Sequence, residues 1–507
     1  MKVLTGAQAR EADRRTIQAG IPGLILMENA AARVVEFLEK RFSPLSAHRI
    51  VVLCGKGNNG GDGMAVARQL YTRSKPEALH VVLLAAPEEL RDEALANYQM
   101  LNACGCPVTR DVPPAAQDAT LVLDALLGTG INGAARGSMA DAIRAINTGF
   151  PMAQVIAIDI PSGMPTDTGD PVGEFVPADY TVTFTAPKVA HVLDPNCECI
   201  GELVVGQIGT REEFYDEAEL SLLEPSMFRA LLQPRPRDGH KGTFGHVLVV
   251  AGSRGKTGAA AMSGLGALRA GAGLVTVASA QSAIATIAGH APELMTEGLP
   301  ETPHGTIALN APLDKLAEGK TVIAMGPGLG RDPAIAQLVM GLNATLAQPM
   351  VLDADALVGR ISSPAGVRVL TPHPGEMGRL TEQSTAEVQK NRLAVAQKYA
   401  TFHGVTVVLK GHRTLIAFPD GRVWINPTGS PAMGTGGSGD ILTGLIAGLL
   451  AQFPKQPDEA VGAAVYLHGL AGELGAKALG EKCLIATDIL QYLPEAMEAC
   501  ADVSHRH

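Results

Sequence analysis

The chain contains 507 residues, and at about 150 residues per domain this length predicts roughly two to four domains. Its 41 Lys and Arg residues and 51 Asp and Glu residues give a formal net charge of −10, which excludes a broad basic surface for nucleic acid. Hydrophobic residues make up 46% of the chain and charged residues 18%, a composition that indicates a globular protein and excludes a disordered one.

No stretch of the sequence predicts a membrane span. The most apolar run, Ile441–Leu450, is far shorter than the roughly 18 residues that a spanning helix needs. Residues 1–16 carry arginines without an apolar core, so we expect no secretory signal. The 7 cysteines are odd in number and lack the spacing of a zinc knuckle. We therefore predict a cytoplasmic protein without a structural metal.

Short apolar runs alternate with amphipathic stretches in the first half of the chain. We predict that the runs are strands buried on both faces and that the stretches between them are helices. The predicted strands are Ile50–Cys54, Leu79–Leu84, Leu121–Leu123 and Val155–Ile158, and the predicted helices are Gly63–Tyr71, Glu88–Cys104 and Ser138–Ile146. This alternation indicates a parallel sheet covered by helices.

A glycine-rich segment, Gly55–Gly63, follows the first predicted strand. Glycines at a strand-to-helix junction expose backbone N–H groups to an anion at the start of the helix. The side chains of Asn58, Asn59 and Asp62 lie where doubly wound sheets bind ligands. A simple turn needs only one or two glycines, so this segment predicts a binding site.

A G-x-G-x-x-G pattern, formed by Gly128, Gly130 and Gly133, follows the third predicted strand. In a dinucleotide-binding fingerprint the helix begins within the motif, whereas here Gly137 and Ser138 mark the expected start of the helix. The pattern alone therefore does not predict a dehydrogenase.

Three aspartates, Asp62, Asp124 and Asp159, lie at or just beyond the ends of predicted strands in this half. Acidic side chains that meet in one crevice without basic neighbours indicate a bound cation or an acid/base role. Each of them alone is also consistent with a helix cap. Lys188, which follows the apolar run Tyr180–Phe184, is equally consistent with a surface lysine.

The alternation restarts after a proline-rich and charged seam, residues 211–242, in which we predict no sustained strand. We place the boundary between domains 1–216 and 217–507. Beyond it, the predicted strands are His246–Val250, Leu274–Ala278, Thr321–Met325, Met350–Leu352, Val367–Leu370, Val405–Leu409 and Thr414–Ala417. The predicted helices are Gly258–Ala270, Thr385–Thr401, Ile441–Ala451 and Asp458–Ala476. The second domain is thus also α/β and is the larger of the two.

The strongest chemical signal is the segment Thr435–Asp440, which leads directly into a predicted helix. Glycines at a helix N-terminus form a site for an anion, and Asp440 in the first turn can accept a hydroxyl proton. This combination suits phosphoryl transfer, in which amides hold phosphoryl oxygens while a carboxylate activates the attacking hydroxyl. A helix cap alone would not need the run of glycines.

Other loops at predicted strand ends carry charged or glycine-rich sequences. Lys410–Thr414 offers two cations and a hydroxyl for nucleotide phosphates, although the same residues suit a hairpin turn. Gly252–Thr257 is too short between its glycines for a P-loop and predicts a substrate loop. His373, held between two prolines, is consistent with a fixed role and with a surface position. The remaining loops are Gly326–Gly330, Asp353–Asp355 and Thr371–Glu376.

Taken in order, these motifs resemble the bifunctional NAD(P)H-hydrate repair family over nearly the whole chain. The N-terminal half is similar to the NAD(P)H-hydrate epimerases in the segments Gly23–Ala30, Asn58–Asp62, Asp124–Gly130 and Asp159–Gly163. The C-terminal half is similar to the ADP-dependent NAD(P)H-hydrate dehydratases in the segments His240–Gly242, Gly252–Gly258, Gly326–Gly330, Thr371–Glu376, Lys410–Thr414 and Gly436–Asp440. The resemblance implies a Rossmann-like α/β/α domain followed by a ribokinase-like α/β domain.

The resemblance implies that the first domain interconverts the two epimers of hydrated NADH or NADPH. The implied substrate-binding residues are Asn58, Asn59, Gly60, Gly61, Asp62, Gly128, Thr129, Gly130, Ile131, Asn132, Gly133, Ala134 and Asp159. A potassium ion is implied near Asn59, Asp124 and Ser162. Asp159 is our candidate for the group that handles the proton.

For the second domain the resemblance implies dehydration of the S epimer at the expense of ADP, which gives AMP and phosphate. Asp440 would activate the hydroxyl, and magnesium would neutralise the phosphates. The implied ADP-binding residues are Lys410, Gly411, His412, Arg413, Thr414 and Gly439, and the implied contacts to the hydrate are Ala259, Gly328, His373 and Asp440. The family also implies a homo-oligomer, a tetramer or larger, whose ligands are small molecules rather than nucleic acid or membrane.

Two alternatives remain open on the residues alone. The second domain is also consistent with an ATP-dependent kinase of small hydroxyl compounds, because such kinases share the segment Gly436–Asp440. The first domain is also consistent with a non-catalytic module that binds a ligand or a protein partner.

Overall fold

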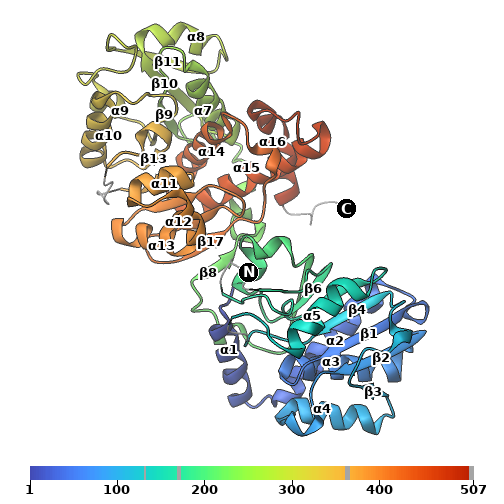
Figure 1. Ribbon diagram of the computed structural model, residues 1–507. Helices are drawn as coiled ribbons and strands as arrows, with labels where there is room; N and C mark the ends of the chain where they lie inside the picture. Colours follow the sequence, from blue (N-terminus) through green and yellow to red (C-terminus); the bar gives the residue numbers. More distant parts are fainter. Residues whose placement is uncertain (131–132, 168–172, 360–365, 502–507) are drawn as a thin grey trace. The chain divides into compact units, whose positions relative to one another are not determined.

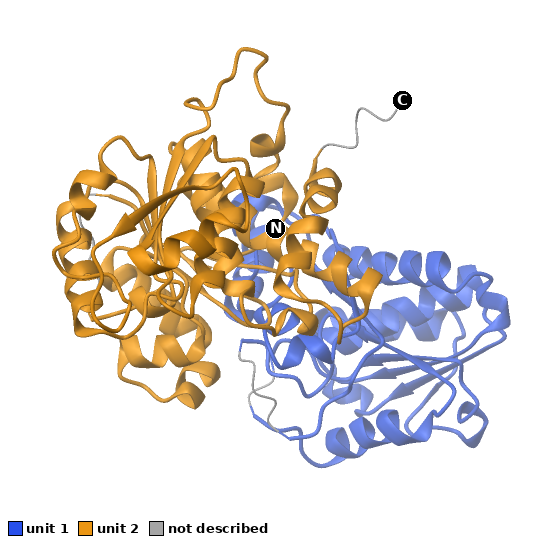
Figure 2. Ribbon diagram, turned by 90° about the horizontal axis from the view of Figure 1, so that it is seen from above, with its two compact units in different colours: residues 1–220 blue, residues 221–507 orange. Residues whose placement is uncertain are grey.

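A computed structural model describes residues 1–130, 133–167, 173–359 and 366–501 of the chain. The chain divides into two compact units, residues 1–220 and 221–507 (Figure 2). In the described ranges, no helix combines the length and the apolar character that crossing a membrane requires.

The first unit is built on a seven-stranded sheet of parallel strands in the order β3-β2-β1-β4-β5-β6-β7. Figure 1 shows this unit with β1, β2, β3, β4 and β6 labelled. The strands are β1 Arg49–Cys54, β2 Ala78–Leu83, β3 Val108–Thr109, β4 Leu121–Ala125, β5 Gln154–Ile158, β6 Tyr180–Phe184 and β7 Glu202–Gly206. The chain moves outward from β1 to β3 and then returns to β4 on the other side of β1. Such a reversal opens a crevice at the carboxyl ends of β1 and β4, where doubly wound sheets bind ligands.

Helices cover both faces of this sheet. They are α1 Gly6–Gln18, α2 Gly23–Arg41, α3 Asn58–Gln69, α4 Asp92–Ala103, α5 Ser138–Gly149 and the short α6 Val189–Val192. Because successive side chains of a strand point to opposite faces, Ile50 and Val52 pack with residues of α2, α3 and α4, whereas Val51 and Leu53 pack with residues of α5. The two-sided burial explains why β1 reads as an unbroken apolar run.

The second unit contains a ten-stranded sheet in the order β11-β10-β9-β12-β13-β14-β15-β16-β17-β8. The strands are β8 Leu220–Leu222, β9 His246–Val250, β10 Leu274–Ala280, β11 Met295–Leu299, β12 Val322–Met325, β13 Met350–Leu352, β14 Arg368–Leu370, β15 Thr406–Leu409, β16 Leu415–Ala417 and β17 Val423–Ile425. The pairs from β11 to β15 are parallel, and β15, β16 and β17 pair antiparallel. The loops that follow β9, β12, β13, β14 and β15 therefore lie along one edge of the sheet.

The helices of the second unit are α7 Thr257–Ala270, α8 Ile284–Ala288, α9 Leu313–Ala317, α10 Pro333–Thr345, α11 Pro374–Thr381, α12 Thr385–Lys390, α13 Arg392–His403, α14 Ser438–Gln452, α15 Pro457–Leu479 and α16 Ala486–Cys500. Glycines allow α7 and α14 to approach closely. A Cβ at Gly266 would lie 2.6 Å from the carbonyl oxygen of Ile441, and a Cβ at Gly444 would lie 2.1 Å from that of Ser263. This contact fixes the position of α14, whose first turn carries Asp440.

The predicted α/β class of both domains, each with a sheet of mainly parallel strands, is confirmed. The start of a helix at Ser138 is also confirmed. Several predicted helices differ in extent: α3 begins at Asn58 instead of Gly63, α4 at Asp92 instead of Glu88 and α14 at Ser438 instead of Ile441. The predicted helix Thr385–Thr401 is two helices that meet at Asn391. The seam also contains the strand β8, which supplies one edge of the second sheet.

Candidate active sites

A cavity of about 720 Å³ opens at the carboxyl ends of β1 and β4 in the first unit. It is lined by the predicted site residues Asn58, Asn59, Asp62, Gly128, Thr129, Gly130 and Asp159. The predicted contacts Gly133 and Ala134 are not among its lining residues, and Ile131 and Asn132 lie outside the described residues. Asn58 and Asn59 open α3, so the amide groups of this helix N-terminus face the cavity region and favour an anion there.

Gly60 and Gly61 serve the packing of α3 and do not line the cavity. A Cβ at Gly60 would lie 1.9 Å from the carbonyl oxygen of Gly55, and a Cβ at Gly61 would lie 2.7 Å from the sulfur of Met27. Gly60 lets the first turn of α3 lie against the residue that follows β1, and Gly61 lets it lie against Met27 of α2. The glycine-rich segment is thus partly a packing device and partly a ligand-facing surface.

Asp159 and Lys188 form an ion pair at the wall of the cavity. The Lys188 Nζ lies 2.6 Å from Asp159 Oδ1 and also donates to Thr183 Oγ1 at 2.8 Å, and Thr183 Oγ1 in turn donates to Asp159 Oδ1 at 2.9 Å. The Lys188 side chain is only 4% exposed. Asp159 has a φ of +64°, a conformation that costs energy outside glycine and recurs at functional sites.

The charge of Lys188 determines the state of Asp159. Burial alone would raise the pKa of Asp159, but the Lys188 ammonium and the hydrogen bonds from Lys188 and Thr183 outweigh it and hold the pKa below its ordinary value. Asp159 is therefore an ionised carboxylate at neutral pH. The sequence alone did not distinguish Lys188 from a surface lysine. Its position after β6, near the strand end that carries Asp159, was the signal that could have placed it in the site.

Two further acidic residues line the same cavity. Burial, with the nearby charges of Asp159 and Asp13, raises the pKa of Asp62 well above its ordinary value. Burial also raises the pKa of Asp13, a residue of α1, to about 6; Lys188 lowers it and Asp159 raises it. Carboxyl groups whose environments move their pKa values in opposite directions are the pattern of an acid and base pair. Asp13 lies outside every motif, so the sequence did not reveal it.

The three residues of the predicted potassium site belong to one buried network. Asp124 accepts from the Ser162 hydroxyl at 2.5 Å and from the Ser162 N–H at 2.7 Å, and burial raises its pKa to about 6 against these hydrogen bonds. The backbone of Leu127 links Ser162 to Asn59, because its N–H donates to Ser162 Oγ and its carbonyl accepts from Asn59 Nδ2, both at 2.9 Å. Asp124 is fully buried within β4 and does not line the cavity. The expected meeting of all three aspartates in one crevice was therefore wrong.

Asn59 supports a hard cation at this network. Its Oδ1 atom is buried and has no hydrogen-bond partner within the described part of the chain. A buried acceptor without a donor is costly, and the oxygens of an amide, a carboxylate and a hydroxyl are ligand types that such cations accept. The residues present thus fit a potassium ion.

In the second unit, Asp440 lies in the first turn of α14, which begins after Gly437 with a φ of +98°. Burial and the negative charge of Asp353 raise the pKa of Asp440 to about 6, while Lys410 opposes them. Behind this turn, His468 of α15 lies 3.0 Å from the carbonyl oxygen of Ser438. Burial lowers the pKa of His468 to about 4, so a neutral imidazole donates from Nε2 and fixes the start of α14.

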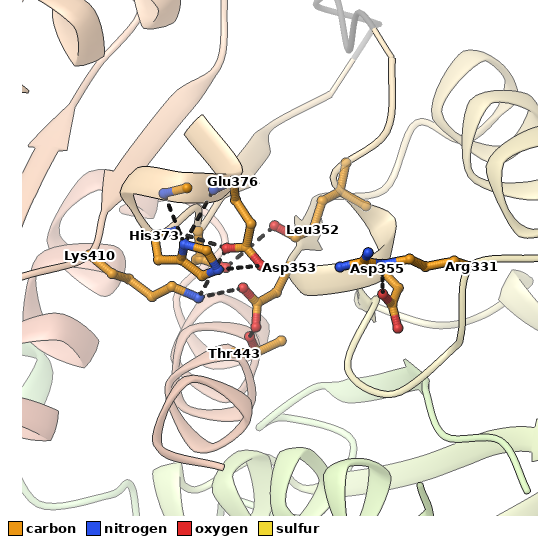
Figure 3. Close-up of polar contacts among 10 residues, drawn as sticks. Arg331, Leu352, Asp353, Asp355, His373, Glu376, Lys410 and Thr443 are labelled. Atoms are coloured by element: carbon orange, nitrogen blue, oxygen red, sulfur yellow. Dashed lines mark hydrogen bonds and ion pairs between the residues drawn. The ribbon is translucent and has the colours of Figure 1, made fainter. Parts of the chain in front are cut away.

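The side chain of Lys410 reaches toward Asp353 (Figure 3). Its Nζ lies 2.7 Å from Asp353 Oδ1 and 3.8 Å from Glu376 Oε2. A Cβ at Gly439 would lie 3.2 Å from this Nζ, which places the ammonium group against the first turn of α14. Burial lowers the pKa of Lys410, but the charges of Asp353 and Glu376 outweigh it, and the net shift is upward. Lys410 is thus a permanent cation beside Asp440.

Arg392 of α13 organises the predicted nucleotide loop Lys410–Thr414. Its guanidinium donates to the carbonyl oxygen of His412 at 2.5 Å and to that of Arg413 at 3.4 Å. Thr414 Oγ1 donates to the carbonyl oxygen of Gly411 at 2.9 Å, and Gly411 has a φ of +146°. The loop is therefore a fixed structure held by a residue that the sequence motifs did not include.

His373 is the N-cap of α11, where its Nδ1 accepts from the N–H groups of Gly375 at 3.0 Å and Glu376 at 3.2 Å. Its Nε2 faces Glu376 Oε1 at 3.3 Å. In the loop after β12, a Cβ at Gly328 would lie 3.0 Å from the Cβ of Ala259 in α7. The predicted hydrate contacts therefore come from α7, from the loop after β12, from the start of α11 and from the first turn of α14.

Comparison with known proteins identifies the family. The bifunctional NAD(P)H-hydrate repair enzyme of Moorella thermoacetica is 42% identical over 515 residues, which cover 97% of this chain and 96% of that protein. The chain belongs to the bifunctional NAD(P)H-hydrate repair family. The corresponding enzyme of Coxiella burnetii is 38% identical and covers 96% of this chain and 97% of its own length.

Each unit also matches a domain family. Residues 23–190 match the YjeF-related protein N-terminus, and residues 247–495 match the NAD(P)H-hydrate dehydratases. A solved structure, the ADP/ATP-dependent NAD(P)H-hydrate dehydratase from Bacillus subtilis co-crystallised with ATP and Mg²⁺, is 36% identical. It covers 55% of this chain and 98% of its own, with a TM-score of 0.50. The resemblance that the sequence motifs predict is thereby confirmed.

Proposed function

We propose that the first unit interconverts the R and S epimers of hydrated NADH and NADPH, and that the second unit dehydrates the S epimer with ADP. The dehydration gives AMP and phosphate and restores the reduced cofactor. The observation that carries this proposal is the similarity of the whole chain to bifunctional repair enzymes. The acid and base groups at the strand ends of each unit support it. A cytoplasmic location and a homo-oligomer stay predictions.

The cavity of the first unit supplies what an epimerisation needs. Water adds to an enamine with its hydroxyl on the carbon next to nitrogen, so the hydrate inverts when the carbon–nitrogen bond opens and closes on the other face. Opening needs a base that takes the hydroxyl proton and an acid that protonates the nitrogen, and closing reverses both transfers. We assign the ionised Asp159 as the base and Asp62, whose pKa is raised, as the acid.

Lys188 and the potassium site support this chemistry. Lys188 keeps Asp159 ionised through the contact at 2.6 Å. Asn59, Asp124 and Ser162 would hold the potassium ion, and Asn59 Oδ1, which has no hydrogen-bond partner among the described residues, is the atom that most needs it. Bound there, the ion supplies positive charge next to the Leu127–Gly130 segment that lines the cavity.

In the second unit Asp440 acts as the base. It removes the proton of the substrate hydroxyl, which attacks the β-phosphorus of ADP, and AMP leaves. The phosphate ester formed is a better leaving group than hydroxide. Phosphate departs, the adjacent ring carbon loses a proton to solvent, and the double bond of the ring is restored. The amides of the first turn of α14 and the Lys410 ammonium hold the phosphoryl oxygens. Magnesium would neutralise the phosphate charge, and phosphate oxygens would be its main ligands, because the Asp353 and Glu376 carboxylates already face Lys410.

Product analysis tests the second half of this proposal. The purified S epimer is incubated with ADP and magnesium, and AMP, phosphate and NADH are measured together. We expect the three products in equal amounts. A stable phosphorylated hydrate, or turnover with ATP and a simple alcohol instead, would show a kinase and contradict the proposal.

A further inference from the structure

The loop after β13 carries an aspartate that no motif assigns to the reaction. The Asp353 side chain is 2% exposed, and its two carboxylate oxygens bind two different elements (Figure 3). Oδ1 accepts from Lys410 Nζ at 2.7 Å, and Oδ2 accepts from Thr443 Oγ1 at 3.0 Å. Asp353 therefore ties the loop after β15 to α14, one turn beyond Asp440.

This connection sets the place of the Lys410 ammonium. A Cβ at Gly439 would lie 3.2 Å from Lys410 Nζ and 3.8 Å from Asp353 Oδ2. Both groups thus lie against the first turn of α14, where the free amide groups of a helix N-terminus attract phosphate. A lysine side chain without a partner would sample many rotamers, so a buried carboxylate at this point selects one of them.

The backbone of Asp353 is itself held rigidly. Its N–H donates to the carbonyl oxygen of Met325 at 3.0 Å, and its carbonyl oxygen accepts from Ala356 N–H at 2.9 Å. Gly326, with a φ of +133°, lies so close that a Cβ there would be 1.7 Å from the Asp353 carbonyl oxygen. The first glycine of the segment Gly326–Gly330 is therefore required for packing, because only glycine allows this approach.

We propose that Asp353, together with Thr443, is a positioning residue of the dehydratase reaction. It holds the Lys410 ammonium at the N-terminus of α14, where this cation meets the phosphoryl group that moves from ADP to the substrate hydroxyl. Asp353 touches neither ADP nor the hydrate and acts through Lys410. The inference rests on the proposed function of the second unit.

The first test replaces the charge of Asp353 while keeping its shape, as Asp353→Asn. We expect a loss of about 10²-fold in kcat/KM for ADP, the size of effect that a misplaced catalytic group produces. The matched control is Asp420→Asn, an exposed aspartate of the same unit that pairs with Arg422.

The pH profile separates positioning from a merely structural role. Asp440 is faced by Asp353, Asp355 and Lys410, and Lys410 is faced by Asp353, Glu376 and Asp440. Asp353 raises the pKa of Asp440 more than Lys410 lowers it. The acid limb of kcat should therefore move to lower pH in Asp353→Asn. A folded variant with unchanged kcat/KM for ADP and an unchanged acid limb would overturn the proposal.

A second pair of variants keeps the proposal testable if Asp353→Asn fails to fold. Thr443→Val keeps the volume and removes the hydroxyl, and Thr443→Ser restores the hydroxyl. We expect weaker ADP binding by calorimetry with magnesium in Thr443→Val and wild-type binding in Thr443→Ser. Equal binding by both variants would overturn the proposal. The proposed function and the placement of Lys410 are tested separately. Absence of repair activity in the wild-type protein would contradict the proposed function, whereas the calorimetric comparison of the two Thr443 variants tests the placement of Lys410.

Discussion

The Lys188–Asp159 pair predicts how the epimerase loses activity when one partner is removed. In Lys188→Met the carboxylate loses the ammonium at 2.6 Å. Removing one partner of a buried pair costs about 3–5 kcal/mol, because the other charge stays buried and unpaired. Some of this cost is avoided when the carboxylate takes up a proton, so the pKa of Asp159 should rise from below its ordinary value to above it.

The sign of the pH effect follows from that change. A group whose folded pKa is depressed contributes stability above its unfolded pKa, and this contribution is lost as the pH falls through the folded pKa. In Lys188→Met the depression disappears, so the acid limb of epimerisation moves to higher pH, and at a given pH a larger fraction of Asp159 is protonated. We expect epimerisation at pH about 7 to fall by about 10²–10⁴-fold, the range of a general-base contribution, with partial recovery at higher pH.

The assay follows the conversion of the R epimer to the S epimer by chromatography over a range of pH. The dehydratase activity of the same chain is an internal control for folding and concentration, and it should stay unchanged. Lys40→Met, an exposed lysine of α2, is the matched control variant. Wild-type epimerisation in folded Lys188→Met, with an unmoved acid limb, would refute the role assigned to this pair.

Three further predictions concern other parts of the chain. Asp440→Ala should lose about 10²–10⁴-fold in phosphate release from the S epimer, while epimerisation continues. In the wild-type protein, phosphate release should fall by half near pH 6, because the pKa of Asp440 is about 6. Near-wild-type phosphate release by Asp440→Ala would contradict the role of this residue. Potassium should raise the melting temperature of the wild-type protein more than lithium does, and this difference should vanish in Asn59→Ala; a difference that persists would place the ion elsewhere. In urea unfolding, Gly444→Ala should destabilise the second unit by about 1–3 kcal/mol, because its Cβ would meet a carbonyl oxygen at 2.1 Å. The control Gly341→Ala, in open space on α10, should be neutral or stabilising.

The sequence predicts many of the parallel strands because buried parallel strands are short, unbroken apolar runs, as β12 and β13 are. It predicts α3 poorly because the glycines that suggest a loop, Gly60 and Gly61, are needed for close packing of the helix. Local pattern carries no information about which backbone atom a missing Cβ would meet.

The sequence motifs likewise identify the strand-end loops of each site, but they do not identify the residues that hold or charge the groups on these loops. Asp13, Lys188 and Arg392 act through contacts with residues far away in the chain, such as the pair between Lys188 and Asp159. Asp124 shows the converse, since its motif position suggested a cavity residue and its carboxylate is instead bound by Ser162. Burial and partner identity decide these roles, and both depend on the tertiary fold.

The central claim is that one chain carries both repair reactions. We would follow absorbance at about 340 nm, where reduced nicotinamide absorbs, with purified protein, an epimeric mixture of NADH hydrate, potassium, magnesium and ADP. Dehydration alone stops when the S epimer is consumed, so full recovery of NADH by the wild-type chain, with incomplete recovery by Asp159→Ala over the same time, is the result we predict. Recovery that stops at the S fraction in both proteins would contradict the epimerase assignment, and no recovery in either would contradict the account as a whole.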